Sequence, residues 1–105
     1  MDLYNADNLT DYLWGASLKS VKLTLPLVTK AQKLFYQQTN LTDVKLTLPK
    51  ATECYMMLSR CIGLTSVELE LPNCRMAQSM FTQCTSLTSI TLKLPKAHKA
   101  WHVFI

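Results

Sequence analysis

Four cysteines are the residues of this chain best suited to bind a metal or to form a covalent cross-link. They are Cys54, Cys61, Cys74 and Cys84, and the spacings between them are seven, thirteen and ten residues. A structural zinc site usually contains two cysteines about two to four residues apart, and none of these spacings is that short. We interpret the four as free thiols that act as compact hydrophobic residues in the core. A disulfide and a metal site are the alternatives.

Other residues that could do chemistry are few. His98 and His102 are four residues apart, which suits two metal ligands on one helix, but they flank Trp101 and have no third ligand. The chain contains no HExxH, GxSxG or P-loop motif, and its two glycines leave little material for a phosphate-binding loop. Glu68 and Glu70 are expected on the solvent face of a strand, with lysines as lateral neighbours. The sequence therefore predicts a protein that is not an enzyme and has no cofactor and no metal site.

The elements that position these residues come from an internal repeat. The chain divides into segments of 23 residues that align without a gap, namely 18–40, 41–63, 64–86 and the shorter 87–105. Each opens with leucine, has Val or Ile three residues later and leucine five and seven residues later, and then has proline. A Leu-rich period of about 20 to 29 residues is typical of leucine-rich-repeat solenoids, in which each unit hides its apolar face against its neighbours.

The first part of each unit alternates strictly between apolar and polar residues. In the third unit, Val67, Leu69 and Leu71 alternate with Glu68 and Glu70. This period of two predicts a half-buried strand, and the proline that follows is expected to end it, because proline has no N–H for the ladder. We therefore expect Leu23, Leu46, Leu69 and Leu92 to line up as one interior column.

The second part of each unit has small or apolar residues at helical spacing. Ala77, Met80 or Phe81, and Cys84 recur in this way, which predicts a short helix with one buried face and places Phe81 inside the stack. Cys61 and Cys84 occupy equivalent positions and should form a stack of buried thiols. The predicted fold class is an α/β repeat, a leucine-rich-repeat solenoid with a parallel β-sheet on one face and short helices on the other. Residues 1–17 are expected to be a partial repeat that caps the N-terminal end as a helix.

One sequence motif resembles the repeats of a known protein family. The segment MFTQCTSLTSI at residues 80–90, together with the Leu71-Pro72 pair, is similar to the repeats of BspA-like, or Treponema-type, leucine-rich-repeat proteins. The resemblance covers about residues 18–105, although Gln38 stands where later units have cysteine. It implies a bacterial protein displayed at the cell surface or secreted, used for adhesion and protein binding.

Charge and hydropathy narrow the classes of partner. The net charge is +4, with Asp2, Asp7 and Asp11 in the first 17 residues and only basic charges after Glu70. The basic residues are spread singly, which argues against nucleic acid as a partner. No stretch approaches the roughly 20 apolar residues of a membrane span, and no basic start followed by an apolar run marks a signal peptide. Neither membrane insertion nor a targeting signal is therefore predicted, and the localisation stays open.

Binding is expected on the outward side chains of the strands, which should form a regular concave array. The candidate partner-binding residues are Lys22, Thr24, Asp43, Lys45, Thr47, Glu68, Glu70, Thr91 and Lys93. The apolar C-terminal end is a candidate for self-association into a homo-oligomer, through Trp101, Val103, Phe104 and Ile105. The sequence thus predicts a protein-binding or adhesion module with a protein partner of unknown identity. The alternatives are a structural spacer within a larger surface or phage protein, and a small inhibitor of a specific target.

Overall fold

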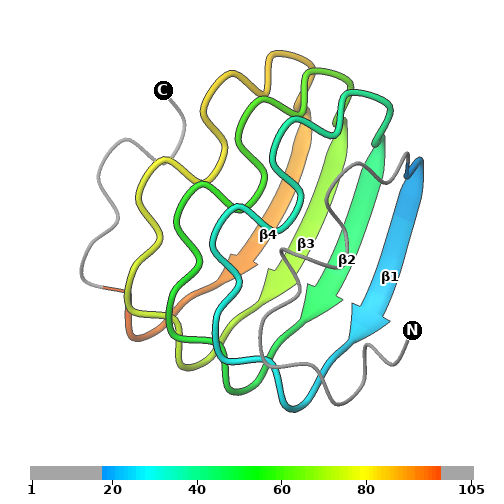
Figure 1. The fold of residues 1–105 in the computed structure, drawn as a ribbon. Coiled ribbons are helices and arrows are strands. Elements are labelled where there is room, and N and C mark those ends of the chain that lie inside the picture. Colours follow the sequence, from blue (N-terminus) through cyan, green and yellow to red (C-terminus); the bar gives the residue numbers. More distant parts are fainter. Residues whose placement is uncertain (1–17, 98–105) are drawn as a thin grey trace.

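The computed structural model describes residues 18–97 and shows one parallel β-sheet at the side of a solenoid (Figure 1). The strands are β1 (Ser20–Thr24), β2 (Asp43–Thr47), β3 (Ser66–Glu70) and β4 (Ser89–Lys93), and they lie in the order β1-β2-β3-β4. The expected N-terminal cap at residues 1–17, the His98 and His102 pair and the expected self-association residues at 101 and 103–105 lie outside the described residues.

The strands pair in register at a constant step of 23 residues. Leu23 pairs with Leu46, Leu46 with Leu69 and Leu69 with Leu92, so the predicted interior column is confirmed. The burial of β3 alternates as expected, with Val67 and Leu69 buried and Ser66, Glu68 and Glu70 exposed. Because each strand lies beside its counterpart in the next coil, one apolar pattern repeated along the chain becomes one continuous core.

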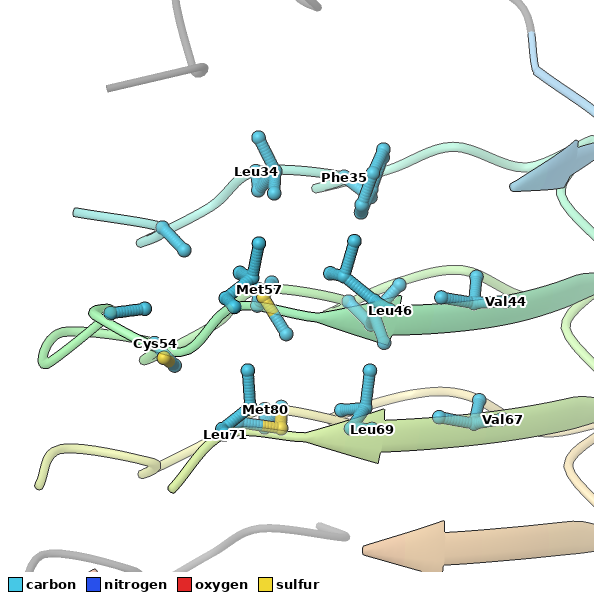
Figure 2. Packing of buried hydrophobic residues seen from close by; sticks show 14 of the residues in the cluster. Leu34, Phe35, Val44, Leu46, Cys54, Met57, Val67, Leu69, Leu71 and Met80 are labelled. Atoms are coloured by element: carbon cyan, nitrogen blue, oxygen red, sulfur yellow. The ribbon is translucent and has the colours of Figure 1, made fainter. Parts of the chain in front are cut away.

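The core consists of side chains stacked at equivalent positions of successive coils. Figure 2 shows Val44 beside Val67 and Leu46 beside Leu69 on the strand side, with Met57 and Met80 facing them from the opposite wall. Phe81 is only 1% exposed, which confirms its predicted place inside the stack. The residues predicted from helical spacing thus do face the interior.

The predicted short helices, in contrast, are wrong. No helix occurs among residues 18–97, and the wall opposite the sheet is built from turns at residues 32–37, 55–60 and 78–83. Its backbone bonds run between coils: the N–H of Phe35 donates to the carbonyl of Met57 at 2.8 Å, and that of Leu58 to the carbonyl of Met80 at 3.0 Å. A helix would satisfy these groups within its own segment, whereas here the neighbouring coil supplies the acceptor.

The turns explain why the helical spacing was misleading. Between the bonds to the next coil lie local bonds from residue i to residue i−3, such as Leu34 N–H to the Ala31 carbonyl at 3.3 Å. Each of the three turn segments places two residues in the left-handed region, with φ between 55° and 63°: Lys33 and Gln37, Met56 and Arg60, and Ser79 and Gln83. Consecutive turns of this kind return a side chain to the interior every three or four residues, as a helix does.

Threonine hydroxyls join the coils at the start of the strands. The Thr65 hydroxyl donates to the Thr42 carbonyl at 3.0 Å, and the Thr88 hydroxyl donates to the Thr65 carbonyl at 3.2 Å. These bonds give a structural reason for the Leu-Thr pair that opens the later repeats. The sheet is therefore held in register by side chains as well as by its backbone ladder.

Candidate protein-binding surfaces

The sheet carries the predicted partner-binding residues together on its outer face. Eight of the nine are exposed, and Thr47 is half-buried. In-register pairing places them in columns across the strands: Lys22, Lys45, Glu68 and Thr91 form one column, and Thr24, Thr47, Glu70 and Lys93 form the next. The structure thus brings all nine residues onto one surface, which we call the sheet face.

The charges on the sheet face are partly paired across the strands. Lys45 Nζ lies 3.7 Å from Glu68 Oε2, as expected for lateral neighbours of opposite sign, and both side chains are about half exposed. Ser20 Oγ donates to Asp43 Oδ2 at 2.6 Å. An exposed ion pair contributes only about 0.2 to 1 kcal/mol. These contacts therefore position the side chains but leave them open to a partner.

One pairing on the sheet face is unfavourable. Lys22 lies directly opposite Lys45, and among residues 18–97 Lys22 has no ion-pair partner. Like charges directly opposite on adjacent strands destabilise a sheet by roughly 0.2 to 1 kcal/mol. At the other end, Glu70 lies opposite Lys93, and both border a shallow depression that spans β2, β3 and β4. The sheet face is thus positive over β1, of mixed charge over β2, where Asp43 and Lys45 are both exposed, and negative over β3.

A second group of exposed side chains, on the turn wall, was missed by the sequence analysis. Lys33 Nζ lies 5.6 Å from the centre of the Tyr36 ring, and Arg60 Cζ lies 5.8 Å from it. Both distances are within the roughly 6 Å of a cation–π contact. Lys33 and Tyr36 are three residues apart, but nothing in the sequence pattern pointed to Arg60, which comes from the next coil.

The equivalent thiols Cys61 and Cys84 lie in adjacent coils as the repeat predicts, but only Cys61 is buried, whereas Cys84 is half-buried. Cys61 Sγ donates to the Phe35 carbonyl at 3.1 Å and Cys84 Sγ to the Leu58 carbonyl at 3.1 Å, so equivalent thiols make equivalent contacts with the preceding coil. Burial raises the pKa of the Cys61 thiol to about 12 and also raises that of Cys84. A protonated thiol is a poor nucleophile and a poor metal ligand, so neither residue is suited to catalysis.

Cys54 and Cys74 are buried neighbours in adjacent coils. Interaction with Cys74 and burial raise the pKa of the Cys54 thiol, while interaction with Cys54 lowers the pKa of Cys74, whose Sγ donates to the Met76 carbonyl at 3.7 Å. All four cysteines are free thiols in this structure. Within residues 18–97, no group of three or more His, Cys, Asp or Glu side chains could hold a metal ion.

Comparison with known proteins adds no relative. Among residues 18–97, no helix is long and apolar enough to cross a membrane. No family model, no curated protein and no solved structure matches this chain. The described solenoid thus has two candidate binding surfaces, the sheet face and the cluster around Tyr36.

Proposed function

We propose that this chain is a non-enzymatic protein-binding module that presents its sheet face to a protein partner. The main support is Lys22, which lies opposite Lys45 and forms no ion pair within residues 18–97, on a sheet whose other exposed charges lie across the strands in register. The resemblance to BspA-like leucine-rich repeats supports the same role, in adhesion at a bacterial cell surface or after secretion. A solenoid of this kind acts through the side chains that its strands display.

The charges of the sheet face define the chemistry of the partner. A carboxylate placed between Lys22 and Lys45 relieves their repulsion and gains two ionic contacts, so the partner should present an acidic segment at this position. The Glu68 and Glu70 side chains on β3 favour a basic group beside that segment. Because the face offers no exposed aromatic or arginine side chain from its strands, the association should depend strongly on ionic strength.

Reversal of the charge at Lys22 should weaken partner binding without weakening the fold. Lys22→Glu should pair with Lys45 and raise the melting temperature slightly, while it removes the positive site for the partner. The immobilised chain is exposed to host surface proteins, and the retained proteins are compared for the parent, Lys22→Glu and the control Lys50→Glu. Lys50 is also exposed but lies at the corner after β2, away from the sheet face.

The proposal requires one stoichiometric partner that the parent and Lys50→Glu retain and that Lys22→Glu loses. Equal retention by all three proteins would exclude the sheet face. If no partner is retained by any of them, the structural-spacer alternative is favoured over a binding role, whereas capture of one enzyme with loss of its activity favours the inhibitor alternative.

Self-association is a second candidate, and the edge at β4 favours it. Ile90 is 40% exposed, whereas its counterpart Val67 is 2% exposed. Strand β4 is the last in the sheet, so one side of its backbone faces no further described strand. If a second copy covers this edge, light scattering should show a dimer that Ile90→Lys dissociates. A parent that stays monomeric at millimolar concentration would rule this candidate out.

A further inference from the structure

The cluster of Lys33, Tyr36 and Arg60 on the turn wall, here called the Tyr36 cluster, has the composition of a binding site. Two cations from different coils lie 5.6 Å and 5.8 Å from the centre of the same ring. Lys33 and Arg60 are exposed and Tyr36 is half-buried. Tyrosine and arginine are the residue types enriched at the centres of protein interfaces, and the strands of the sheet face supply neither.

The backbone holds this cluster in place before any partner arrives. The Lys33 N–H donates to the Tyr55 carbonyl at 3.1 Å, the Tyr36 N–H to the Lys33 carbonyl at 3.2 Å, and the Arg60 N–H to the Thr82 carbonyl at 2.7 Å. Each residue of the cluster is thus fixed by a turn or by the next coil. A preorganised site loses less conformational entropy on binding than a flexible loop does.

The positive charge of the cluster is uncompensated within the described chain. Three of the four carboxylates between residues 18 and 97 lie on the sheet face, and the fourth, Glu53, forms no ion pair there. Neither Lys33 nor Arg60 has a carboxylate within ion-pair distance among these residues. The Tyr36 ring therefore lies beside two cations, Lys33 and Arg60, whose N–H groups are available to a partner.

We propose that the Tyr36 cluster binds adjacent carboxylates in an acidic peptide segment of a partner protein. The Arg60 guanidinium can hold one carboxylate through two parallel N–H groups, and the Lys33 ammonium can hold the next as a point charge. The Tyr36 ring keeps both cations in place and offers an apolar surface to the aliphatic part of a glutamate. This site is on a different wall from the sheet face, so the inference does not depend on the proposed function.

Acidic peptide is favoured over nucleic acid because the cluster is small. A protein that binds a nucleic acid backbone typically neutralises about six to ten phosphates along a continuous basic track. The Tyr36 cluster supplies two cations, and the next two coils place the neutral Met56 and Ser79 at the positions equivalent to Lys33. Two adjacent carboxylates match this arrangement, whereas a run of phosphates does not.

The test measures binding of a fluorescein-labelled peptide of six glutamates by fluorescence anisotropy. We expect saturable binding at low salt, weaker binding as salt is added, and none to the matched peptide of six glutamines. Lys33→Gln combined with Arg60→Gln should weaken the affinity about tenfold. Tyr36→Phe, which keeps the ring, should stay within about twofold of the parent, whereas Tyr36→Leu should weaken binding about threefold.

Matched controls locate the site and protect against loss of folding. Lys50→Gln combined with Arg75→Gln removes the same two positive charges at exposed positions outside both proposed sites and should leave the affinity within about twofold. Thermal unfolding of each variant identifies any that fails to fold. Amide resonances of residues 33–37 and 60 should shift on titration with the glutamate peptide.

Two results would overturn the proposal. One is an equal loss of affinity in the Lys50→Gln and Arg75→Gln control and in the Lys33→Gln and Arg60→Gln variant, since the peptide would then be responding to net charge alone. The other is tighter binding of labelled oligothymidylate than of the glutamate peptide, with the same residues shifting, since the cluster would then be a phosphate site. In both cases the Lys22→Glu experiment on the sheet face keeps its own outcome.

Discussion

Substitution of Gln37 by glycine tests the turn wall directly, because turns and a helix predict opposite signs. Gln37 is exposed, has φ of 58°, and its N–H donates to the Ser59 carbonyl at 2.9 Å. The left-handed conformation costs a non-glycine residue about 1 to 2 kcal/mol, and glycine avoids this cost. Glycine also makes the unfolded chain more flexible, which offsets about 0.4 to 1 kcal/mol of the gain.

The net expectation for Gln37→Gly is a stabilisation of about 0.5 to 1 kcal/mol. For a domain of this size, that raises the melting temperature by on the order of 3 to 6 °C. In a helix the same substitution would instead destabilise by about half a kcal/mol or more, because glycine is among the poorest helix formers. Urea and thermal unfolding, followed by circular dichroism, measure both the sign and the size.

Two further substitutions at residue 37 complete the test. Gln37→Ala should change stability little, and Gln37→Val should destabilise, because a β-branched side chain fits the left-handed region poorly. The turn wall therefore predicts the order Gly, then Gln and Ala, then Val, whereas a helix predicts Ala first and Gly last. An observed order with Ala most stable and Gly least stable would refute the assignment of turns at residues 32–37.

The remaining predictions concern the core and the close approach of the coils. Phe81→Ala should destabilise the domain by about 3 to 5 kcal/mol, measured by urea unfolding, because the ring is 1% exposed; a melting temperature within two degrees of the parent would mean that the ring is not in the core. Gly63→Ala should destabilise the domain by about 1 to 3 kcal/mol in urea unfolding, because a Cβ there would lie 2.8 Å from the Thr39 carbonyl oxygen. Ser86→Ala, at the equivalent exposed position, should leave the stability nearly unchanged. Equal effects of the two substitutions would show that the close approach at Gly63 is not the cause. Burial raises the pKa of the Cys61 thiol from 9.0 to about 12, so the neutral thiol contributes fully to the free energy of unfolding below pH 9, and this contribution is lost as the pH rises toward 12. Thermal unfolding as a function of pH should show this alkaline loss of stability. An equally steep loss in Cys61→Ala would show that Cys61 is not its source.

The sheet could be predicted in detail from the amino-acid sequence. Strict alternation in segments such as 67–71 identifies a strand with one buried face, and the constant step of 23 residues sets its register. Both signals are local or periodic, so they are visible without knowledge of the fold. The sheet face follows for the same reason, because residues that alternate with the buried ones must point to solvent.

The opposite wall could be predicted only in part. The spacing of Ala77, Met80 and Phe81 correctly indicates which side chains are buried, yet a helix and a series of turns share that spacing. What distinguishes them is the acceptor for the backbone N–H groups, because in this wall alternate N–H groups, such as those of Lys33, Phe35 and Gln37, donate to the carbonyl 22 residues further along the chain. No local pattern reports such a distant partner.

The sequence by itself determined the repeat, the strands, their register and the identity of the core. Only the tertiary structure decided the conformation of the second wall and the meeting of Tyr36 with Arg60 across two coils. The physical reason is that side-chain periodicity reports which residues avoid water, whereas hydrogen-bond partners and cross-coil contacts depend on what the packed neighbour offers.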